Sequence, residues 1–250
     1  MEKKKMLKNK LVLEINNVKK YYNSFLALNN ISLKINSGEL VVLLGPNGAG
    51  KSTLFSIITG LMRADSGACL INGYNIADNT ISALKNLGVV FQQPTIDLEL
   101  TVKQNLLFHS RLHGIDLNLV KKTIYEELVK TGLEKKINNK ARTLSGGERR
   151  KVELIRSLLH KPKMLLMDEP TVGLDPGSRT DLLRKILNLK KTKSLSILWT
   201  THLVDEAEKA DKIIILNKGI IKTAGTQSEI LSLAKEKNLA NAFLKIVKGE

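Results

Sequence analysis

The order of apolar and polar residues along the chain predicts strands of two kinds. Residues 31–35 alternate between apolar and polar side chains, a period of two that is typical of a strand with one buried face. Residues 11–15 also predict a strand, and residues 40–44 are apolar at every position, which is typical of a strand buried on both faces within a parallel sheet. The apolar runs 165–167 and 197–199 predict two further buried strands, each followed by polar residues. Because ligands bind at the carboxyl ends of strands in open α/β sheets, the pattern predicts an α/β core with a site at that edge.

The middle third of the chain changes to a helical period. Thr101, with Gln104 three residues later, has the pattern of a capping box, and the helix that it opens is predicted to end at Gly114. A second helix is predicted over Asn118–Thr131, because apolar side chains recur there on one face and Gly132 follows as a stop signal.

These helices separate two parts of the α/β core. We expect residues 11–93 and 151–230 to form the core, with residues 94–150 inserted between them as a helical subdomain. A hairpin is predicted over residues 213–221, and a helical tail is expected over residues 231–250.

Composition narrows the possible settings. Of the 250 residues, 42% are hydrophobic, which is enough for a sizeable buried core. No apolar run approaches the roughly 20 residues that a membrane-spanning helix requires. The single cysteine, Cys69, excludes an internal disulfide and a multi-cysteine metal site, and we expect it to pack as a small apolar residue. These features favour a cytoplasmic protein.

The net charge of +16 allows three interpretations: nucleic-acid binding, attachment near an anionic membrane face, or a solvated surface rich in lysine. The basic residues are scattered in short clusters such as Lys3–Lys10, and they are not interleaved with aromatic residues, which make up 4% of the chain. This pattern favours the solvated surface, and we expect no nucleic-acid partner.

A glycine-rich segment follows the buried strand at 40–44 and fits the phosphate-binding loop pattern G-x-x-x-x-G-K-[ST]. Its residues are Gly45, Pro46, Asn47, Gly48, Ala49, Gly50, Lys51 and Ser52, and we include the next residue, Thr53. Glycines let successive backbone N–H groups point at phosphate oxygens, and the following helix adds its positive N-terminal end. Lys51 is expected to contact the β- and γ-phosphates of a nucleotide, and the Ser52 hydroxyl is expected to bind Mg²⁺.

Two consecutive carboxylates, Asp168 and Glu169, follow the buried strand at 164–167. At the carboxyl end of that strand, Asp168 can face Mg²⁺ while Glu169 orients a water molecule and acts as its general base. An apolar run followed by Asp-Glu is common on its own and is more often structural. The assignment of Asp168 and Glu169 to a nucleotide site therefore rests on the presence of the phosphate-binding loop as well.

The segment Leu144-Ser145-Gly146-Gly147-Glu148 resembles the signature of the ATP-binding cassette (ABC) ATPases. The resemblance extends over residues 11–230, with the motifs in the order of that family. It implies a P-loop NTPase (RecA-like) core, an N-terminal antiparallel β-subdomain and an inserted helical subdomain. It also implies that Ser145, Gly146 and Gly147 contact the ATP held by a second ATPase subunit, so that two ATP molecules lie at the interface of a dimer.

The same resemblance assigns roles to four further residues. It implies that Tyr22 stacks on adenine and that Gln92 contacts Mg²⁺ or the attacking water, with Gln93 as the neighbouring candidate. It implies that Asp175 crosses the dimer interface and that His202 contacts the γ-phosphate.

The motifs depart from the commonest forms of the family at two places. The signature ends in Glu148, where Gln is commoner, and residues 172–175 read Val-Gly-Leu-Asp, where Ser-Ala-Leu-Asp is commoner. Residues 89–95 together with residues 173–176 look most like the ATPases of ABC-2-type exporters.

We therefore expect the ATP-hydrolysing subunit of a transporter, which binds ATP and Mg²⁺ and powers separate membrane (permease) subunits. It should lie at the cytoplasmic face of the inner (plasma) membrane, with a homodimer as the expected form. The alternative is a soluble ABC ATPase of the iron–sulfur assembly or DNA-maintenance type. Leu144 lies 52 residues after Gln92, which leaves room for a compact helical subdomain but not for the coiled-coil arms of the DNA-maintenance type. The exporter-like variants argue against the iron–sulfur type.

Overall fold

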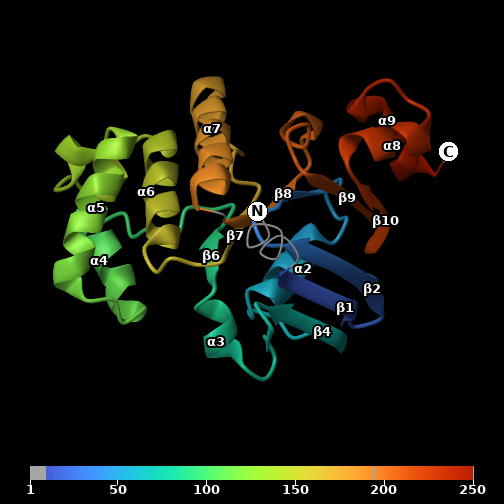
Figure 1. Ribbon diagram of the computed structural model, residues 1–250, viewed down its shortest axis with the longest axis horizontal. Coiled ribbons are helices and arrows are strands. Elements are labelled where there is room, and N and C mark those ends of the chain that lie inside the picture. The colour runs from blue at the N-terminus through green and yellow to red at the C-terminus, as the bar shows by residue number, and fades with distance from the viewer. Residues whose placement is uncertain (1–9, 194, 250) are drawn as a thin grey trace, which may run out of the picture.

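Two β-sheets, the helices between and around them, and a helical lobe make up the part of the chain that the computed structural model describes, residues 10–193 and 195–249 (Figure 1). Most of the basic cluster Lys3–Lys10 lies outside these residues.

The first sheet is antiparallel, with the strand order β2-β1-β4-β5. Its strands are β1 (Leu11–Tyr22), β2 (Phe25–Asn36), β4 (Ser66–Ile71) and β5 (Tyr74–Asn75). Strand β1 runs seven residues beyond the end that its apolar pattern predicted at residue 15. The alternation breaks at Asn17, which has a φ of 50° where the register of β1 against β2 shifts between Ile15 and Val18. A bulge therefore hides the second half of this strand from a pattern of period two.

The second sheet has the order β10-β9-β3-β8-β7-β6. Strands β6 (Leu87–Val90), β7 (Met164–Asp168), β8 (Ser196–Thr201), β3 (Leu40–Leu44) and β9 (Lys212–Asn217) are parallel, and β10 (Ile220–Gly225) forms the predicted hairpin with β9. All five residues of β3 are buried. The sheet confirms the doubly buried strands that the unbroken apolar runs predicted.

Side chains of β3 alternate between the two large apolar clusters on the two faces of this sheet. Val41 and Leu43 join the first cluster, which lies between the sheets and includes α2 (Lys51–Ile58). Val42 and Leu44 join the second, with residues of α7 (Pro176–Lys193), α8 (Gln227–Ala234) and α9 (Leu239–Lys248). Both faces of β3 are therefore covered by apolar side chains, and the phosphate-binding loop begins at the carboxyl end of this buried strand.

The helical lobe contains α4 (Val102–Leu112), α5 (Leu117–Thr131) and α6 (Gly146–Leu158), and it lies at one end of the molecule (Figure 1). Its first cap is the predicted capping box: the Gln104 N–H donates to Thr101 Oγ1 at 3.1 Å, and the Thr101 N–H donates to Gln104 Oε1 at 2.8 Å. Gly132 ends α5 with a φ of 70°, as predicted.

The apolar core of the lobe extends from Ile96 to Leu159. Helix α6 crosses the division between insertion and core that we place at residue 150, and beyond that residue it still contributes Val152 and Ile155 to the apolar core of the lobe. The domain division stays a proposal. The remaining short elements are α3 (Thr80–Leu84), η1 (Glu134–Lys136), η2 (Ala141–Thr143) and η3 (Val204–Glu206).

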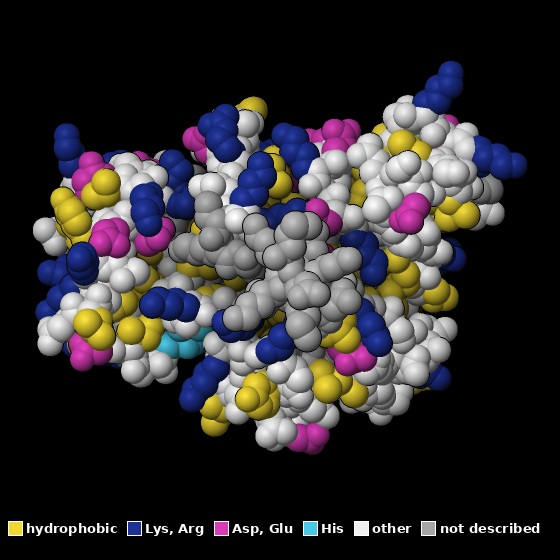
Figure 2. Space-filling model, viewed as in Figure 1, with side chains coloured by type: hydrophobic (Ala, Val, Ile, Leu, Met, Phe, Trp, Pro, Cys, Tyr) yellow, Lys and Arg dark blue, Asp and Glu magenta, His cyan; other side chains and the backbone are white. Residues whose placement is uncertain are grey.

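Within the described ranges, no helix is both long and apolar enough to span a bilayer. Cys69 is buried in the first apolar cluster, where burial raises the pKa of its thiol to about 12. On the face seen in Figure 2, lysine and arginine side chains are spread over the helical lobe, α7 and the C-terminal helices, with acidic side chains between them.

Candidate functional site

The segment from Gly45 to Ser52 joins β3 to α2 at the carboxyl edge of the parallel sheet. Gly50 requires the absence of a side chain, because its φ is 105° and a Cβ there would lie 2.8 Å from Leu28 Cδ2 and 3.0 Å from the Ala27 carbonyl oxygen. As the N-cap of α2 it offers no side-chain acceptor. The first N–H groups of α2 have no partner within the helix, which suits them to bind an anion.

A cavity of about 560 Å³ lies at this edge. It brings together residues from distant parts of the sequence: Tyr22, Phe25, Ala27, Asn47, Gly48, Gly50, Lys51, Ser52, Thr53, Gln92, Glu169, Val172 and His202. Tyr22 and Phe25 are both largely exposed, so their rings are free to contact a ligand. Phe25 and Ala27 belong to no motif and carried no signal in the sequence as cavity residues, and Val172 was noted only as part of the motif at residues 172–175.

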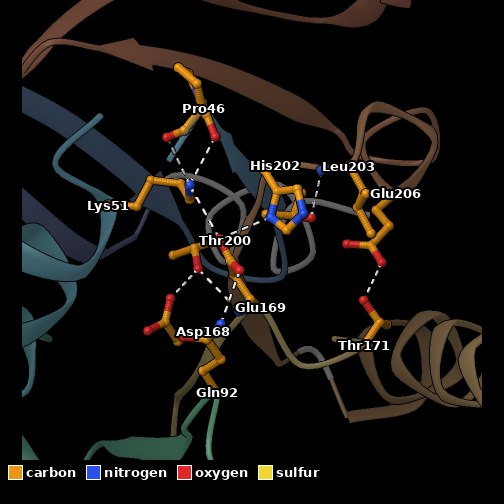
Figure 3. A network of polar contacts seen from close by, with 12 residues as sticks. Pro46, Lys51, Gln92, Asp168, Glu169, Thr171, Thr200, His202, Leu203 and Glu206 are labelled. Carbon is orange, nitrogen blue, oxygen red and sulfur yellow. Dashed lines mark hydrogen bonds and ion pairs between the residues drawn. The ribbon is translucent and has the colours of Figure 1, made fainter. Parts of the chain in front are cut away.

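Some residues of the predicted phosphate-binding loop do not line the cavity. Ala49 is buried in the apolar core, and the carbonyl oxygens of Gly45 and Pro46 accept hydrogen bonds from Lys51 Nζ at 2.8 Å and 3.1 Å. The Lys51 ammonium also lies 3.2 Å from Glu169 Oε1, and both side chains are buried (Figure 3). The charge of Lys51 is therefore balanced by Glu169, and an incoming phosphate must compete with this carboxylate.

Asp168 is the last residue of strand β7, which pairs with strand β8, and Glu169 follows it directly. The parallel register sets Asp168 opposite Thr200, whose hydroxyl donates to Asp168 Oδ1 at 2.5 Å. Burial raises the pKa of the Asp168 carboxyl, and the hydrogen bond from Thr200 opposes that shift. No motif in the sequence pointed to Thr200, because its role depends on the register of two strands.

Three side chains converge on Glu169 from separate elements (Figure 3). Besides Lys51, Gln92 Nε2 donates to Glu169 Oε2 at 3.3 Å, and His202 Nδ1 lies 3.2 Å from Glu169 Oε1. The backbone of Glu169 is strained, with a φ of 41°, and its N–H donates to the Thr200 carbonyl oxygen at 3.1 Å. The backbone thus aims the Glu169 carboxylate into the cavity.

Oxygen ligands for a cation lie near this carboxylate. The exposed Ser52 hydroxyl and the Gln92 amide oxygen line the cavity, whereas Asp168 does not line it but interacts electrostatically with Glu169 and Lys51. All three supply the hard oxygen donors that Mg²⁺ prefers. The residues present therefore fit Mg²⁺.

Helix α6 holds the Gln92 segment in place. The Arg150 guanidinium donates to the carbonyl oxygens of Phe91 and Gln92 at 2.6 Å and 2.7 Å and to Glu153 Oε2 at 2.9 Å, and the Thr95 N–H donates to Glu153 Oε1 at 2.6 Å. Arg150 and Glu153 are buried. The sequence analysis did not identify either residue. The only signal available was a pair of opposite charges three residues apart within a helix, and that signal is weak.

The signature residues lie at the start of the same helix. Ser145 is the N-cap of α6, and its Oγ accepts from the Glu148 N–H at 3.2 Å while Glu148 Oε2 accepts from the Ser145 N–H at 3.0 Å. Lys136 Nζ lies 2.5 Å from Glu148 Oε1, and this hydrogen bond lowers the pKa of the Glu148 carboxyl. The charge that Glu148 introduces is thus paired within the chain.

The structure does not bring the signature residues or Asp175 to the phosphate cavity of the same chain. Ser145 and Gly146 are exposed, Gly147 is buried, and none of the three lines the cavity. Asp175 is exposed at the start of α7, where its Oδ1 accepts from the Ser178 N–H at 2.9 Å.

The sequence of this chain matches a known protein family. The sequence model of the family described as "ABC transporter" matches residues 28–172, more than half of the chain. The linearmycin resistance ATP-binding protein LnrL of Bacillus subtilis is 37% identical over 88% of this chain and 71% of its own length. A sulfate/thiosulfate import ATP-binding protein, CysA of Pseudomonas syringae, is 38% identical over 87% of this chain and 68% of its own length.

Solved structures agree as well. One described as the ATP-binding subunit of an ABC transporter has a TM-score of 0.86 and 29% identity, covering 94% of this chain and 99% of its own. The ADP conformation of the cassette MJ1267 has a TM-score of 0.80 and 29% identity, covering 94% of this chain and 98% of its own. These likenesses confirm the P-loop NTPase fold with an antiparallel β-subdomain and a helical insertion. The chain belongs to the ABC transporter family, as an ATP-binding domain that hydrolyses ATP to power transport.

Proposed function

We propose that this chain is the ATPase subunit of an ABC-2-type exporter, with Glu169 as the general base. The observation that carries the catalytic assignment is the convergence of Lys51, Gln92 and His202 on the Glu169 carboxylate inside the cavity. A carboxylate in this position can accept the proton of an attacking water. The side chains around this carboxylate are suited to bind phosphate, in the case of Lys51 and His202, and to hold the attacking water, in the case of Gln92.

Each part of the nucleotide has a matching group in the cavity. The loop N–H groups and Lys51 bind the β- and γ-phosphates, Tyr22 stacks on adenine at the exposed side, and His202 contacts the γ-phosphate. Ser52, Asp168 and Gln92 hold Mg²⁺, which neutralises charge on the phosphate oxygens when it is bound.

The position of the signature residues supports a dimer. Ser145 and Gly146 are exposed, and Ser145 begins a helix whose first N–H groups suit a phosphate, yet they do not line the cavity of their own chain. We propose that they contact the ATP of a second copy and that Asp175 lies at the same interface. In this arrangement the start of α6 contacts the ATP of the second copy. Further along the same helix, Arg150 holds the Gln92 segment, which lies beside the ATP of its own chain.

Export is supported by the motif forms at residues 89–95 and 173–176, and by the relatives LnrL and DrrA, whose names describe resistance to linearmycin and doxorubicin. The percentage of identical residues does not distinguish export from import, because the import proteins CysA and PotA are 38% and 34% identical to this chain. We propose that the chain docks on permease subunits at the cytoplasmic face of the inner (plasma) membrane and that it has no nucleic-acid partner.

Phosphate release from ATP by the purified chain tests the catalytic part of this proposal. We expect turnover that requires Mg²⁺ and that falls sharply in Asp168→Asn, which keeps the shape of the side chain but removes its charge. Equal turnover with Mg²⁺ and with excess EDTA would remove Asp168 and Ser52 from the proposed metal site.

The direction of transport is tested with the permease subunits in vesicles, where ATP supplied on the side of this chain should move the substrate away from that side.

A further inference from the structure

Three of the four histidines of the chain form a cluster away from the nucleotide cavity. His109 and His113 lie one turn apart on α4, and His160 follows the end of α6 by two residues. Their ring centroids are 4.6 Å apart for His109 and His113, 6.0 Å for His109 and His160, and 3.9 Å for His113 and His160. Histidine side chains are visible where the helical lobe meets the rest of the molecule (Figure 2).

One ring nitrogen from each histidine lies within 4.8 Å of the other two. His160 Nε2 lies 3.0 Å from the Leu87 carbonyl oxygen. A carbonyl can only accept, so Nε2 carries the proton and Nδ1 keeps its lone pair. Metal-binding histidines are commonly fixed in this way, by a hydrogen bond from the other ring nitrogen.

Two nitrogens in the cluster are buried without a hydrogen-bond partner among the described residues, namely His160 Nδ1 and His109 Nε2. Most buried polar atoms in proteins are paired, so these two need an explanation. Burial lowers the pKa of His109 to about 3 and that of His160 to about 4, which keeps both rings neutral at pH 7, the form that binds a metal ion.

The charges around the cluster are positive. The charge of Arg156 contributes to the lowered pKa of His109, while the Arg156 guanidinium donates to the Thr95 carbonyl oxygen at 2.9 Å. The cluster itself contains no carboxylate. It therefore does not suit Mg²⁺ or Ca²⁺, and a bound ion must gain enough from the imidazoles to outweigh Arg156.

We propose that His109, His113 and His160 bind a divalent transition-metal ion, with Zn²⁺ as the expected ion. Imidazole is a preferred ligand of Zn²⁺, and three protein ligands leave a fourth, tetrahedral position for water. Zn–N bonds of about 2.0–2.1 Å separate ligand atoms by roughly 3.4 Å. The ring nitrogens, which lie within 4.8 Å of one another, must therefore approach, and the His113 ring, stacked on His160 with an angle of 10° between the ring planes, must turn toward the ion. The ion joins α4 of the helical lobe to the end of α6 and, through the Leu87 contact of His160, to the start of β6.

Titration of the full, untagged chain with ZnCl₂ and CoCl₂ tests the site. Excess Mg²⁺ is included to occupy the carboxylate and hydroxyl groups of the nucleotide cavity. We expect one equivalent of metal per chain by calorimetry, visible absorption bands of Co²⁺ in a low-symmetry site, and a higher midpoint of thermal unfolding. Each of His109→Ala, His113→Ala and His160→Ala should weaken binding at least about tenfold, since loss of an outer hydrogen-bond partner alone costs about 10–100-fold.

His202→Ala is the matched control, because it removes the fourth histidine and should leave this binding unchanged. Circular dichroism checks that each variant is folded, ATP binding adds a second check for the three variants of the cluster, and His113→Gln serves where the alanine variant is unstable. Absence of a bound equivalent, binding that survives the triple variant, or loss of binding in His202→Ala would each overturn the site.

Discussion

Lys51 Nζ lies 3.2 Å from Glu169 Oε1, so the cation of the phosphate-binding loop and the proposed general base form a buried ion pair. Gln92 and His202 contact the same carboxylate. We expect a bound phosphate to compete with Glu169 for Lys51, so that binding of ATP and the position of the base depend on each other.

Lys51→Ala should abolish tight ATP binding, because it removes charge-assisted contacts worth about 1.5–3 kcal/mol each. A fluorescent-nucleotide titration measures the loss. Lys34→Ala is the matched control, since Lys34 pairs with Glu14 in an exposed position of the first sheet. Wild-type affinity in Lys51→Ala would contradict the assignment of the loop.

Glu169→Gln should bind ATP but hydrolyse it about 10²–10⁴-fold more slowly, as expected for loss of a general base. It also frees Lys51 and removes negative charge near the phosphates, so a dimer that encloses ATP should accumulate. Size-exclusion chromatography with Mg-ATP, beside a turnover assay, measures both effects, with the exposed Glu208→Gln as control. Near-normal turnover would exclude Glu169 as the base, whereas a slow but monomeric variant would argue against the dimer.

Arg150→Met should lower turnover more than ATP affinity. The change releases the carbonyl oxygens of Phe91 and Gln92 but leaves the phosphate-binding loop intact. It also leaves Glu153 without its cation, and breaking a buried pair in this way costs about 3–5 kcal/mol of stability. Urea unfolding measures that cost, and adding Glu153→Gln should restore part of the stability but not the turnover. An equal loss of turnover and affinity would show that Arg150 does not act through Gln92.

Residues 92–101 should dock the membrane subunit. Most of them are exposed, and Arg150 and Glu153 of α6 hold the start of this segment, so both the nucleotide and a partner can sense its motion. Crosslinks from single cysteines in the assembled transporter should cluster in this segment. If they fall instead on residues 231–250, the docking assignment is wrong.

Stability should fall as the pH drops below about 6.5, and the loss should continue down to the folded-state pKa values of about 4 for His160 and about 3 for His109. Burial lowers the pKa of His109 and His160 in the folded chain below their ordinary value, so the unfolded chain takes up protons first and the stabilisation present above pH 6.5 is lost as pH falls. Urea unfolding with EDTA present, at pH 7.5 and 5.5, measures this difference. It should shrink in the double variant His109→Gln/His160→Gln, and an unchanged difference would assign it to other groups.

The sequence by itself determined the elements whose signals lie within a few residues. The unbroken apolar run of β3, the glycines before Lys51 and the caps at Thr101 and Gly132 act through local backbone geometry and burial, so their patterns are readable in order along the chain. The carboxylates Asp168 and Glu169 after a buried strand form a similar local pattern, whereas Gln92 and His202 became candidates through the resemblance to the ABC ATPases.

Only the tertiary structure decided which side chains meet. Thr200 reaches Asp168 because two parallel strands pair in one register, and a shift of one residue would turn it to the other face of the sheet. Arg150 reaches Gln92 from 58 residues away because of how α6 packs against the core. His160 joins His113 for the same reason, at the junction of lobe and core. Such contacts depend on distances between elements that are remote in sequence, which no local pattern of apolar and polar residues encodes.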